Sequence, residues 1–207
     1  MSTPSFVHRF VPAPSQRPAK RTLLLLHGTG GDEDDLLPLG RELDPEAALI
    51  SPRGKISENG LRRFFRRLAE GIFDEEDVVR RAHELADFIL AATVEYQIDP
   101  ADLMAVGYSN GANIAAAVLL LRPEVLAGAI LFRAMLPLNS QPAPDLGGRR
   151  VLISAGEMDP IVPAENAQRL SGLLRAGGAE VTFALQPSGH GLVPGDLSAA
   201  RDWLRDQ

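Results

Sequence analysis

Three residues whose types allow nucleophilic catalysis occur in the order Ser, Asp, His, each directly after an apolar stretch. Ser109 lies in "VGYSNGAN", Asp159 in "GEMDPIVP" and His190 in "PSGHGL". A serine hydroxyl is a poor nucleophile at neutral pH, so an imidazole must take its proton and a carboxylate must hold the imidazole in the right tautomer. The residue types and their order therefore predict a catalytic triad that attacks a carbonyl carbon.

The serine is the middle residue of a G-x-S-x-G pentapeptide, which runs from Gly107 to Gly111. The pentapeptide stands between an apolar run and a long apolar helix pattern. At such a strand-to-helix junction the turn is so tight that a Cβ at either glycine would collide with a neighbouring strand or helix. We therefore expect a strained turn that presents the hydroxyl beside a helix N-terminus, where backbone N–H groups favour developing negative charge.

Each of the three residues also has a structural interpretation. The serine could be a small residue in a turn, the aspartate a loop or capping residue, and the histidine a hydrogen-bonded structural residue. Glu157 is the nearest competing acid. His8 and His83 fall on an expected strand and an expected helix with no matching context, so we interpret them as structural or exposed.

A glycine-rich loop, "HGTGGDEDDL", follows the apolar strand "TLLLL". Ester hydrolysis passes through an oxyanion that needs two backbone hydrogen-bond donors. The amide of Asn110, directly after the nucleophile, is one candidate. The amide of Thr29 is the other, because the second donor is expected from this loop.

The same loop has two competing interpretations. Residues 28–33 read G-x-G-x-x-E, which lacks the third glycine of a dinucleotide-binding loop, although Arg53 could be imagined to meet a 2′-phosphate. The acids Asp32–Asp35 would lie beside a pyrophosphate, or they could suggest a metal. They are more simply explained as the start of a helix through Leu36 and Leu39, where acids favour the helix dipole. We therefore expect no metal at this loop.

Strand-like and helix-like segments alternate along the chain and must position these residues. Several strands are continuous apolar runs, which suit burial on both faces. The alternation predicts one α/β domain over residues 1–207 with a mostly parallel sheet, and ligands bind at the carboxyl ends of such strands. We expect strands at Phe6–Val11, Arg21–His27, Ala47–Ser51, Leu103–Tyr108, Ala129–Ala134, Arg150–Ala155 and Glu180–Gln186. We expect helices at Glu75–Tyr96, Asn110–Leu121, Ala164–Ala176 and Leu197–Arg205.

The composition narrows the classes of protein. A formal net charge of −6 argues against nucleic acid as a partner, because a phosphate backbone needs clustered Lys and Arg. The chain has no cysteine, which removes disulfides and thiolate metal sites. No run of about 18 apolar residues predicts a membrane span, and the N-terminal sequence has no apolar signal region. The cytoplasm is therefore the expected location.

The motifs together resemble the phospholipase/carboxylesterase family of α/β-hydrolases, which also holds acyl-protein thioesterases. The resemblance covers nearly the whole chain and rests on "LLLHGTGGDEDDL", "ISPRG", "VGYSNGAN", "GEMDPIVP" and "GHGL". The stretch "ENGLRRFFRR…EGIFDEEDV" is similar to a subgroup of small bacterial esterases. The resemblance implies the triad and oxyanion hole named above, no cofactor, and in many members a homodimer. Many members carry Gln after the nucleophilic serine, whereas this chain has Asn110.

Specificity is expected to depend on the loop Gly54–Arg67, since the chain has no room for a large helical lid and the site should be open and shallow. Phe64 and Phe65 could form a wall of an acyl pocket, and the arginines of Arg62–Arg67 could attract acidic or phosphate-bearing substrates. The alternative is that one Phe packs in the core while the arginines face water. Met135 is expected to line the pocket or to belong to the core.

These observations predict a serine hydrolase that cleaves small or medium acyl or aryl esters through an acyl-enzyme intermediate. A thioesterase, a lysophospholipase or an acyltransferase with the same triad remains an alternative. A non-catalytic binding module is the least favoured interpretation, because all three triad residues are present.

Overall fold

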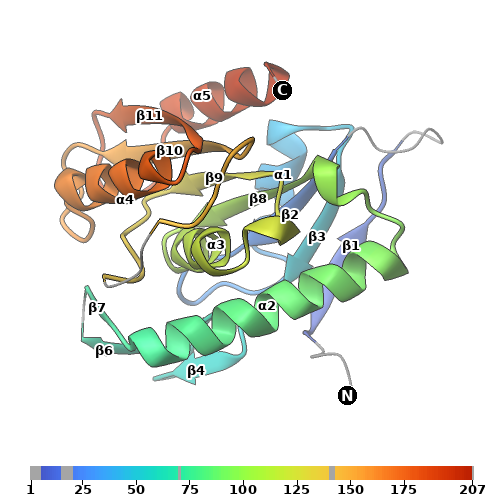
Figure 1. The fold of residues 1–207 in the computed structure, drawn as a ribbon, viewed down its shortest axis with the longest axis horizontal. Helices are drawn as coiled ribbons and strands as arrows, with labels where there is room; N and C mark the ends of the chain where they lie inside the picture. The colour runs from blue at the N-terminus through green and yellow to red at the C-terminus, as the bar shows by residue number, and fades with distance from the viewer. Residues whose placement is uncertain (1–5, 15–20, 70, 140–142, 207) are drawn as a thin grey trace.

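The computed structural model of the chain describes residues 6–14, 21–69, 71–139 and 143–206 (Figure 1). A seven-stranded sheet in the order β1-β3-β2-β8-β9-β10-β11 forms its centre. Strand β1 is antiparallel to β3, and every other neighbouring pair in this sheet is parallel, which confirms the predicted sheet. The strands are β1 (His8–Val11), β2 (Thr22–Leu26), β3 (Ala48–Pro52), β8 (Leu103–Tyr108), β9 (Gly128–Phe132), β10 (Arg150–Gly156) and β11 (Glu180–Gln186).

Helices cover both faces of the sheet, which explains the continuous apolar runs. In β2, Leu24 and Leu26 pack into the core on one face, and Leu23 and Leu25 pack into the core on the other. The first face is covered by α2 (Glu75–Glu95), α3 (Asn110–Leu121) and α4 (Ala164–Ala176) (Figure 1). The second face is covered by α1 (Leu37–Leu43) and α5 (Pro194–Arg205).

The helices begin and end where local chemistry predicts. The carboxylate of Asp74 accepts a hydrogen bond from the amide of Asp77 and so caps α2, while Gly178, the second residue after α4, adopts a φ of +91°. Helix α3 is apolar on all sides, because it is enclosed between the sheet and α2. This burial fixes the position of the helix that follows Ser109.

The chain reverses its direction of travel across the sheet at β2. It passes from β2 through α1 to β3 on one side, and then through α2 to β8 on the other side of β2. The two crossing helices lie on opposite faces, so they leave the carboxyl ends of β2 and β8 uncovered between them. The glycine-rich loop follows β2 and Ser109 follows β8, so both candidate motifs lie at this switch point.

Two small hairpins follow β3, the first within the expected loop Gly54–Arg67 and the second directly after it. They are β4 (Ile56–Glu58) with β5 (Leu61–Arg63), and β6 (Arg67–Ala69) with β7 (Ile72–Phe73). Asn59 and Gly60 connect the first pair with φ values of 51° and 80°. Two residues with positive φ are typical of a tight hairpin turn, and Asn-Gly is its strongest sequence signal, so this hairpin was predictable.

Several boundaries differ from the prediction by one to three residues, and two of these differences have identifiable reasons. Strand β9 ends at Phe132, because Arg133 turns the chain with a φ of 54°. Helix α5 begins at Pro194, because proline suits the first helical position and the Asp196 carboxylate accepts a hydrogen bond of 2.8 Å from the Val193 amide. Within the ranges that the structure describes, no helix combines the length and hydropathy needed to cross a bilayer.

Candidate active site

Ser109 lies in the turn between β8 and α3 in a backbone conformation that is rare for a residue with a side chain. Its φ is 51° and its ψ is −113°. A Cβ on Gly107 would lie 2.6 Å from the Ala112 backbone in α3, and a Cβ on Gly111 would lie 1.9 Å from the carbonyl oxygen of Leu26 in β2. Both flanking glycines are therefore sterically required, one by the helix and the other by the neighbouring strand.

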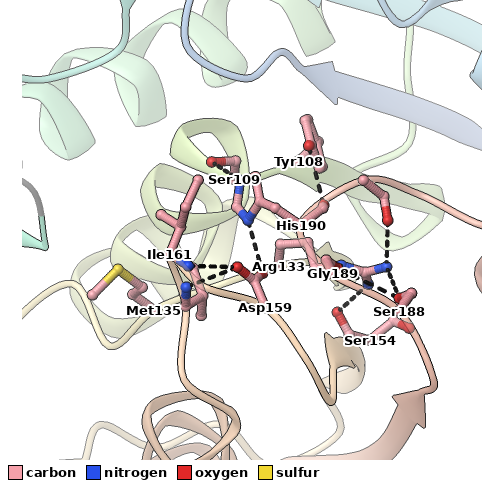
Figure 2. Close-up of polar contacts among 12 residues, drawn as sticks. Tyr108, Ser109, Arg133, Met135, Ser154, Asp159, Ile161, Ser188, Gly189 and His190 are labelled. Atoms are coloured by element: carbon pink, nitrogen blue, oxygen red, sulfur yellow. Dashed lines mark hydrogen bonds and ion pairs between the residues drawn. The ribbon is translucent and has the colours of Figure 1, made fainter.

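The structure brings Ser109, His190 and Asp159 together in one hydrogen-bonded chain (Figure 2). His190 Nδ1 lies 2.8 Å from Asp159 Oδ2, and His190 Nε2 lies 3.0 Å from Ser109 Oγ. An ionised carboxylate only accepts hydrogen bonds, so Nδ1–H donates to it and Nε2 is left to accept the serine hydroxyl. This tautomer is the one that a general base needs.

Asp159 is held by the turn that follows it. Its Oδ1 accepts hydrogen bonds from the amides of Ile161 at 2.8 Å and Val162 at 3.0 Å. The carboxylate is completely buried, so these bonds and His190 orient it. The competing acid Glu157 is exposed at the surface. Of the two acids in this loop, Asp159 is the one hydrogen-bonded to the imidazole.

Arg133 organises the loop that carries His190, and the sequence analysis missed it. Its side chain is completely buried and forms an ion pair of 2.8 Å with the equally buried Asp196 of α5. It also donates to three acceptors in the loop around His190, namely the carbonyls of Gly189 and Gly191 and the hydroxyl of Ser188. A further bond goes to the carbonyl of Ser154 in β10 (Figure 2). The sequence signal was a lone arginine in the apolar stretch "AILFRAML", because a buried charge requires a partner.

The two candidate oxyanion donors lie beside the serine. Thr29 and Asn110 both line the same cavity as Ser109 and His190. The Asn110 side chain has another role: its Oδ1 accepts a hydrogen bond of 2.7 Å from the Phe64 amide. The short side chain at this position therefore anchors the segment that contains Phe64.

His27 connects the glycine-rich loop to the loop Gly54–Arg67. Its Nδ1 donates to the carbonyl of Gly28 at 2.7 Å, and its Nε2 accepts from the amide of Gly54 at 2.9 Å. Burial lowers the pKa of His27, so it remains neutral and can keep accepting at Nε2. The sequence analysis treated this residue only as the end of a strand.

The cavity at Ser109 has a volume of about 240 Å³. Met135 lines it, as do Phe73 and Gly71 of the second hairpin. Phe64 and Phe65, expected as pocket walls, instead pack in the core with 3% and 0% of their surface exposed. Phe65 contacts the ring of Phe73 edge-on, with 5.0 Å between ring centroids, so it supports the wall from behind. The aromatic wall residue is Phe73, which the sequence analysis missed.

The arginines of the stretch Arg62–Arg67 separate into two groups. Arg62 and Arg66 are exposed, as one of the two interpretations expected. Arg63 and Arg67 line the cavity, and both approach Glu58. Within β5 the contrast between Arg62 and Arg63 follows from strand geometry, in which successive side chains point to opposite faces.

The acids after the glycine-rich loop lie before the first turn of α1, and two of them, Glu33 and Asp34, form ion pairs with Arg53 and Arg9. Helix α1 begins at Leu37 and has no acid in its first turn, which corrects the expected role of Asp32–Asp35. Arg53, considered for a 2′-phosphate, donates to Glu33 and lowers the pKa of that carboxyl to about 2. Across the described residues, no group of three or more His, Cys, Asp or Glu side chains is placed to hold a metal ion.

His8 is a structural residue in this fold. It hydrogen-bonds with the Tyr96 hydroxyl at 2.7 Å and with the Phe6 carbonyl at 2.8 Å. The contact with Tyr96 joins β1 to the end of α2, whereas the contact with Phe6 is local. His83 lies within α2 and is half-buried.

The α/β-hydrolase class is defined by a mostly parallel sheet with a serine at a G-x-S-x-G turn. Here that turn follows β8, and an acid and a histidine follow β10 and β11. The chain belongs to the phospholipase/carboxylesterase family, whose model matches residues 8–206. It is therefore a hydrolase of the carboxylesterase type.

Comparisons with individual proteins agree with this assignment. The chain is 48% identical over 184 residues to the putative hydrolase MhqD of Bacillus subtilis (strain 168), covering 89% of this chain and 92% of that protein. It superposes on the Bacillus cereus carboxylesterase with a TM-score of 0.93 at 44% identity, covering 97% of this chain and 94% of that one. A carboxylesterase from Mesorhizobium loti gives a TM-score of 0.91 at 34% identity, with coverage of 98% and 95%.

Proposed function

We propose that the protein cleaves small or medium acyl and aryl esters through an acyl-enzyme intermediate on Ser109. The observation that supports this most directly is the hydrogen-bonded chain from Ser109 through His190 to Asp159. Each contact has the length that proton transfer requires, and each atom has the donor or acceptor role that the reaction assigns to it.

In the first half of the reaction, His190 Nε2 takes the proton of the Ser109 hydroxyl while Oγ attacks the ester carbonyl carbon. The electron pair of the C=O bond moves to its oxygen, and the amides of Thr29 and Asn110 donate to that oxyanion. The oxyanion then collapses and the bond to the alcohol breaks. The alcohol leaves with the proton from Nε2, and the acyl group remains on Ser109.

In the second half, a water molecule gives a proton to His190 Nε2 and attacks the acyl carbon. Collapse of the second oxyanion breaks the bond to Ser109, which recovers the proton from His190. The acid leaves and the site returns to its starting state. Asp159 stays ionised throughout, because its role is to orient the ring and to stabilise the imidazolium.

The dimensions of the cavity favour small substrates. Its volume of about 240 Å³ lies below the range of about 300–1,000 Å³ that is typical of pockets for drug-sized ligands. Its apolar lining includes Phe73, Met135 and Val162. A short acyl or aryl group therefore fits the site better than the long chain of a lysophospholipid.

The other reactions predicted for this triad differ in the leaving group or in the acceptor. Thioester cleavage replaces the alcohol with a thiol, and acyl transfer replaces water with an alcohol. A panel of matched oxygen esters, thioesters and added acceptor alcohols separates them. The homodimer and the cytoplasmic location stay predictions.

The test combines active-site labelling with activity. A fluorophosphonate probe should add its mass to the wild-type protein and not to Ser109→Ala or His190→Ala. Hydrolysis of short p-nitrophenyl esters should fall by about 10⁴-fold to 10⁶-fold in kcat in both variants, because triad members act as a unit.

Ser198→Ala and His83→Ala are the matched controls. Ser198 is exposed on α5 and His83 is half-buried in α2, and neither lines the cavity. Both controls should keep wild-type labelling and activity. Labelling that persists in Ser109→Ala, or a wild type that hydrolyses none of these esters, would contradict the proposal.

A further inference from the structure

The cavity beside Ser109 has an unusual charge distribution. Two of the residues that line it, Arg63 and Arg67, are cations, and none of the described lining residues is an acid. Asp159 lies behind His190, where its side chain is completely buried and accepts hydrogen bonds from three donors. The surface that a substrate meets is therefore positive on the hairpin side.

Arg63 is held rigidly at the base of the hairpins. Its side chain is only 4% exposed, and it donates to Thr29 Oγ1 at 2.7 Å and to the carbonyl of Phe65 at 3.2 Å. Burial lowers the pKa of Arg63, repulsion from Arg67 lowers it further, and Glu58 opposes both effects. The guanidinium is thus fixed next to the glycine-rich loop and close to a second positive charge.

Among the residues that the structure describes, a single carboxylate approaches both arginines. Glu58 Oε2 lies 3.1 Å from Arg67 Nε and 3.5 Å from Arg63 Nε. Glu58 itself does not line the cavity. Counted over the described residues, two cations against one anion leave a net charge of +1 at this part of a small cavity, and an anion bound there would relieve the repulsion between the two arginines.

We propose that Arg63 and Arg67 form a subsite for a carboxylate, so that the preferred substrates are esters that carry a free carboxylate besides the scissile bond. Hemiesters of dicarboxylic acids and aryl esters with a ring carboxylate have this chemistry. The inference rests on the function proposed above.

The charge and shape of the subsite fit a carboxylate better than a phosphate. A monoanion neutralises the net charge of +1, whereas a phosphate monoester carries close to two negative charges at neutral pH. A planar carboxylate also matches the planar edge of a guanidinium. The cavity volume of about 240 Å³ leaves room for a short substrate of this kind.

The experiment compares esters that differ only in charge. The first pair is 4-nitrophenyl hydrogen adipate and methyl 4-nitrophenyl adipate, which place the charge in the acyl half. The second pair is 4-acetoxybenzoate and 4-acetoxybenzamide, which place it in the alcohol half. At pH 7.5 in low salt, the wild type should show a KM about tenfold lower for the charged member of at least one pair, a typical gain from a charge-assisted contact.

Three variants locate the effect. In Arg67→Gln the ratio of KM values, neutral over charged, should fall to about one to two, and in Glu58→Gln it should rise by about threefold, as expected when a compensating charge is removed. Arg66→Gln is the matched control, because it makes the same charge change at the residue that precedes Arg67. The Arg66 side chain is 56% exposed and forms an ion pair with Asp74. Its ratio should stay within about twofold of the wild type.

The outcomes separate the two proposals. A wild type that hydrolyses the neutral esters with the same KM as the charged ones overturns the carboxylate subsite and leaves the esterase proposal standing. An equal loss of preference in Arg66→Gln and Arg67→Gln also overturns it, because the effect would then come from the general charge of the stretch. A wild type that hydrolyses none of the four esters contradicts the esterase proposal itself.

Discussion

On the side of the cavity that carries His190 the ion pair of Arg133 and Asp196 is completely buried, whereas on the hairpin side the ion pair of Arg67 and Glu58 remains partly exposed. The side chains of Arg133 and Asp196 are both 0% exposed, while those of Arg67 and Glu58 are 35% and 25% exposed. Burial acts to raise the pKa of Asp196, but hydrogen bonds, first of all from Arg133, outweigh it and lower the pKa. The buried pair therefore stays charged.

The difference matches what each side has to do. The proposed mechanism requires His190 to be held precisely, and a buried, fully hydrogen-bonded arginine fixes the loop that carries it. The hairpins line the cavity, and partly exposed ion pairs of about 0–1 kcal/mol hold their outer parts. Their inner end is anchored by buried contacts, such as the one between Asn110 and Phe64.

The largest effect is expected from breaking the buried pair. Arg133→Met leaves Asp196 as a buried charge without its main partner, so the free energy of unfolding should fall by about 3–5 kcal/mol. The loop of His190 also loses its donors, so kcat should fall even where the variant is folded. Urea denaturation and ester hydrolysis below the unfolding transition measure the two effects.

The double variant Arg133→Met with Asp196→Leu is the control for this prediction. It removes both charges, so it should recover a substantial part of the lost stability but not the loop hydrogen bonds or the full kcat. This account of the buried ion pair would be contradicted if Arg133→Met lowered the free energy of unfolding by less than about 1 kcal/mol, or if the double variant were as unstable as Arg133→Met.

An intermediate effect is expected from pH at the inner end of the hairpins. Burial lowers the pKa of His27 below its unfolded value of about 6.5, so the unfolded state binds more protons as the pH falls below that value. The contribution of His27 to stability is therefore fully present above about pH 7 and is lost as the pH falls below about 6.5. Unfolding free energies of the wild type and His27→Gln between pH 8 and pH 5 measure it.

Replacing the buried His27 lowers stability at every pH, so the two proteins are compared by the slope of the unfolding free energy against pH. The wild type should lose more stability than His27→Gln over the same interval. Parallel curves for the two proteins would show that His27 does not titrate in this range on unfolding, and would contradict the lowered pKa.

The smallest effect is expected at the outer end of the hairpins. Leu68 and Ile72 are 72% and 57% exposed, so Leu68→Ser and Ile72→Ser should each change the free energy of unfolding by less than about 0.5 kcal/mol. Urea denaturation of both variants checks this. A loss above about 1 kcal/mol would mean that the outer hairpin is packed against another surface in solution, and the contrast between its two ends would fail.

Much of the fold could be predicted because the signals are local. Strands β8 and β11 and helices α3 and α4 have their predicted bounds, since continuous apolar runs and helical periodicity do not depend on distant residues. The hairpin turn at Asn59 and Gly60 was also local and was overlooked. The end of β9 was not predictable in this way, because the turn at Arg133 follows from contacts with residues more than 50 positions later.

The sequence by itself determined the order of Ser109, Asp159 and His190 and the two glycines that flank the serine. Those glycines follow from the sterics of a tight turn, which act over a few residues. Only the tertiary structure decided that Phe73 lines the cavity in place of Phe64 and Phe65, and that Arg63 and Arg67 share Glu58. It alone also enclosed Arg133 behind His190, because which side chains meet depends on how segments distant in sequence pack.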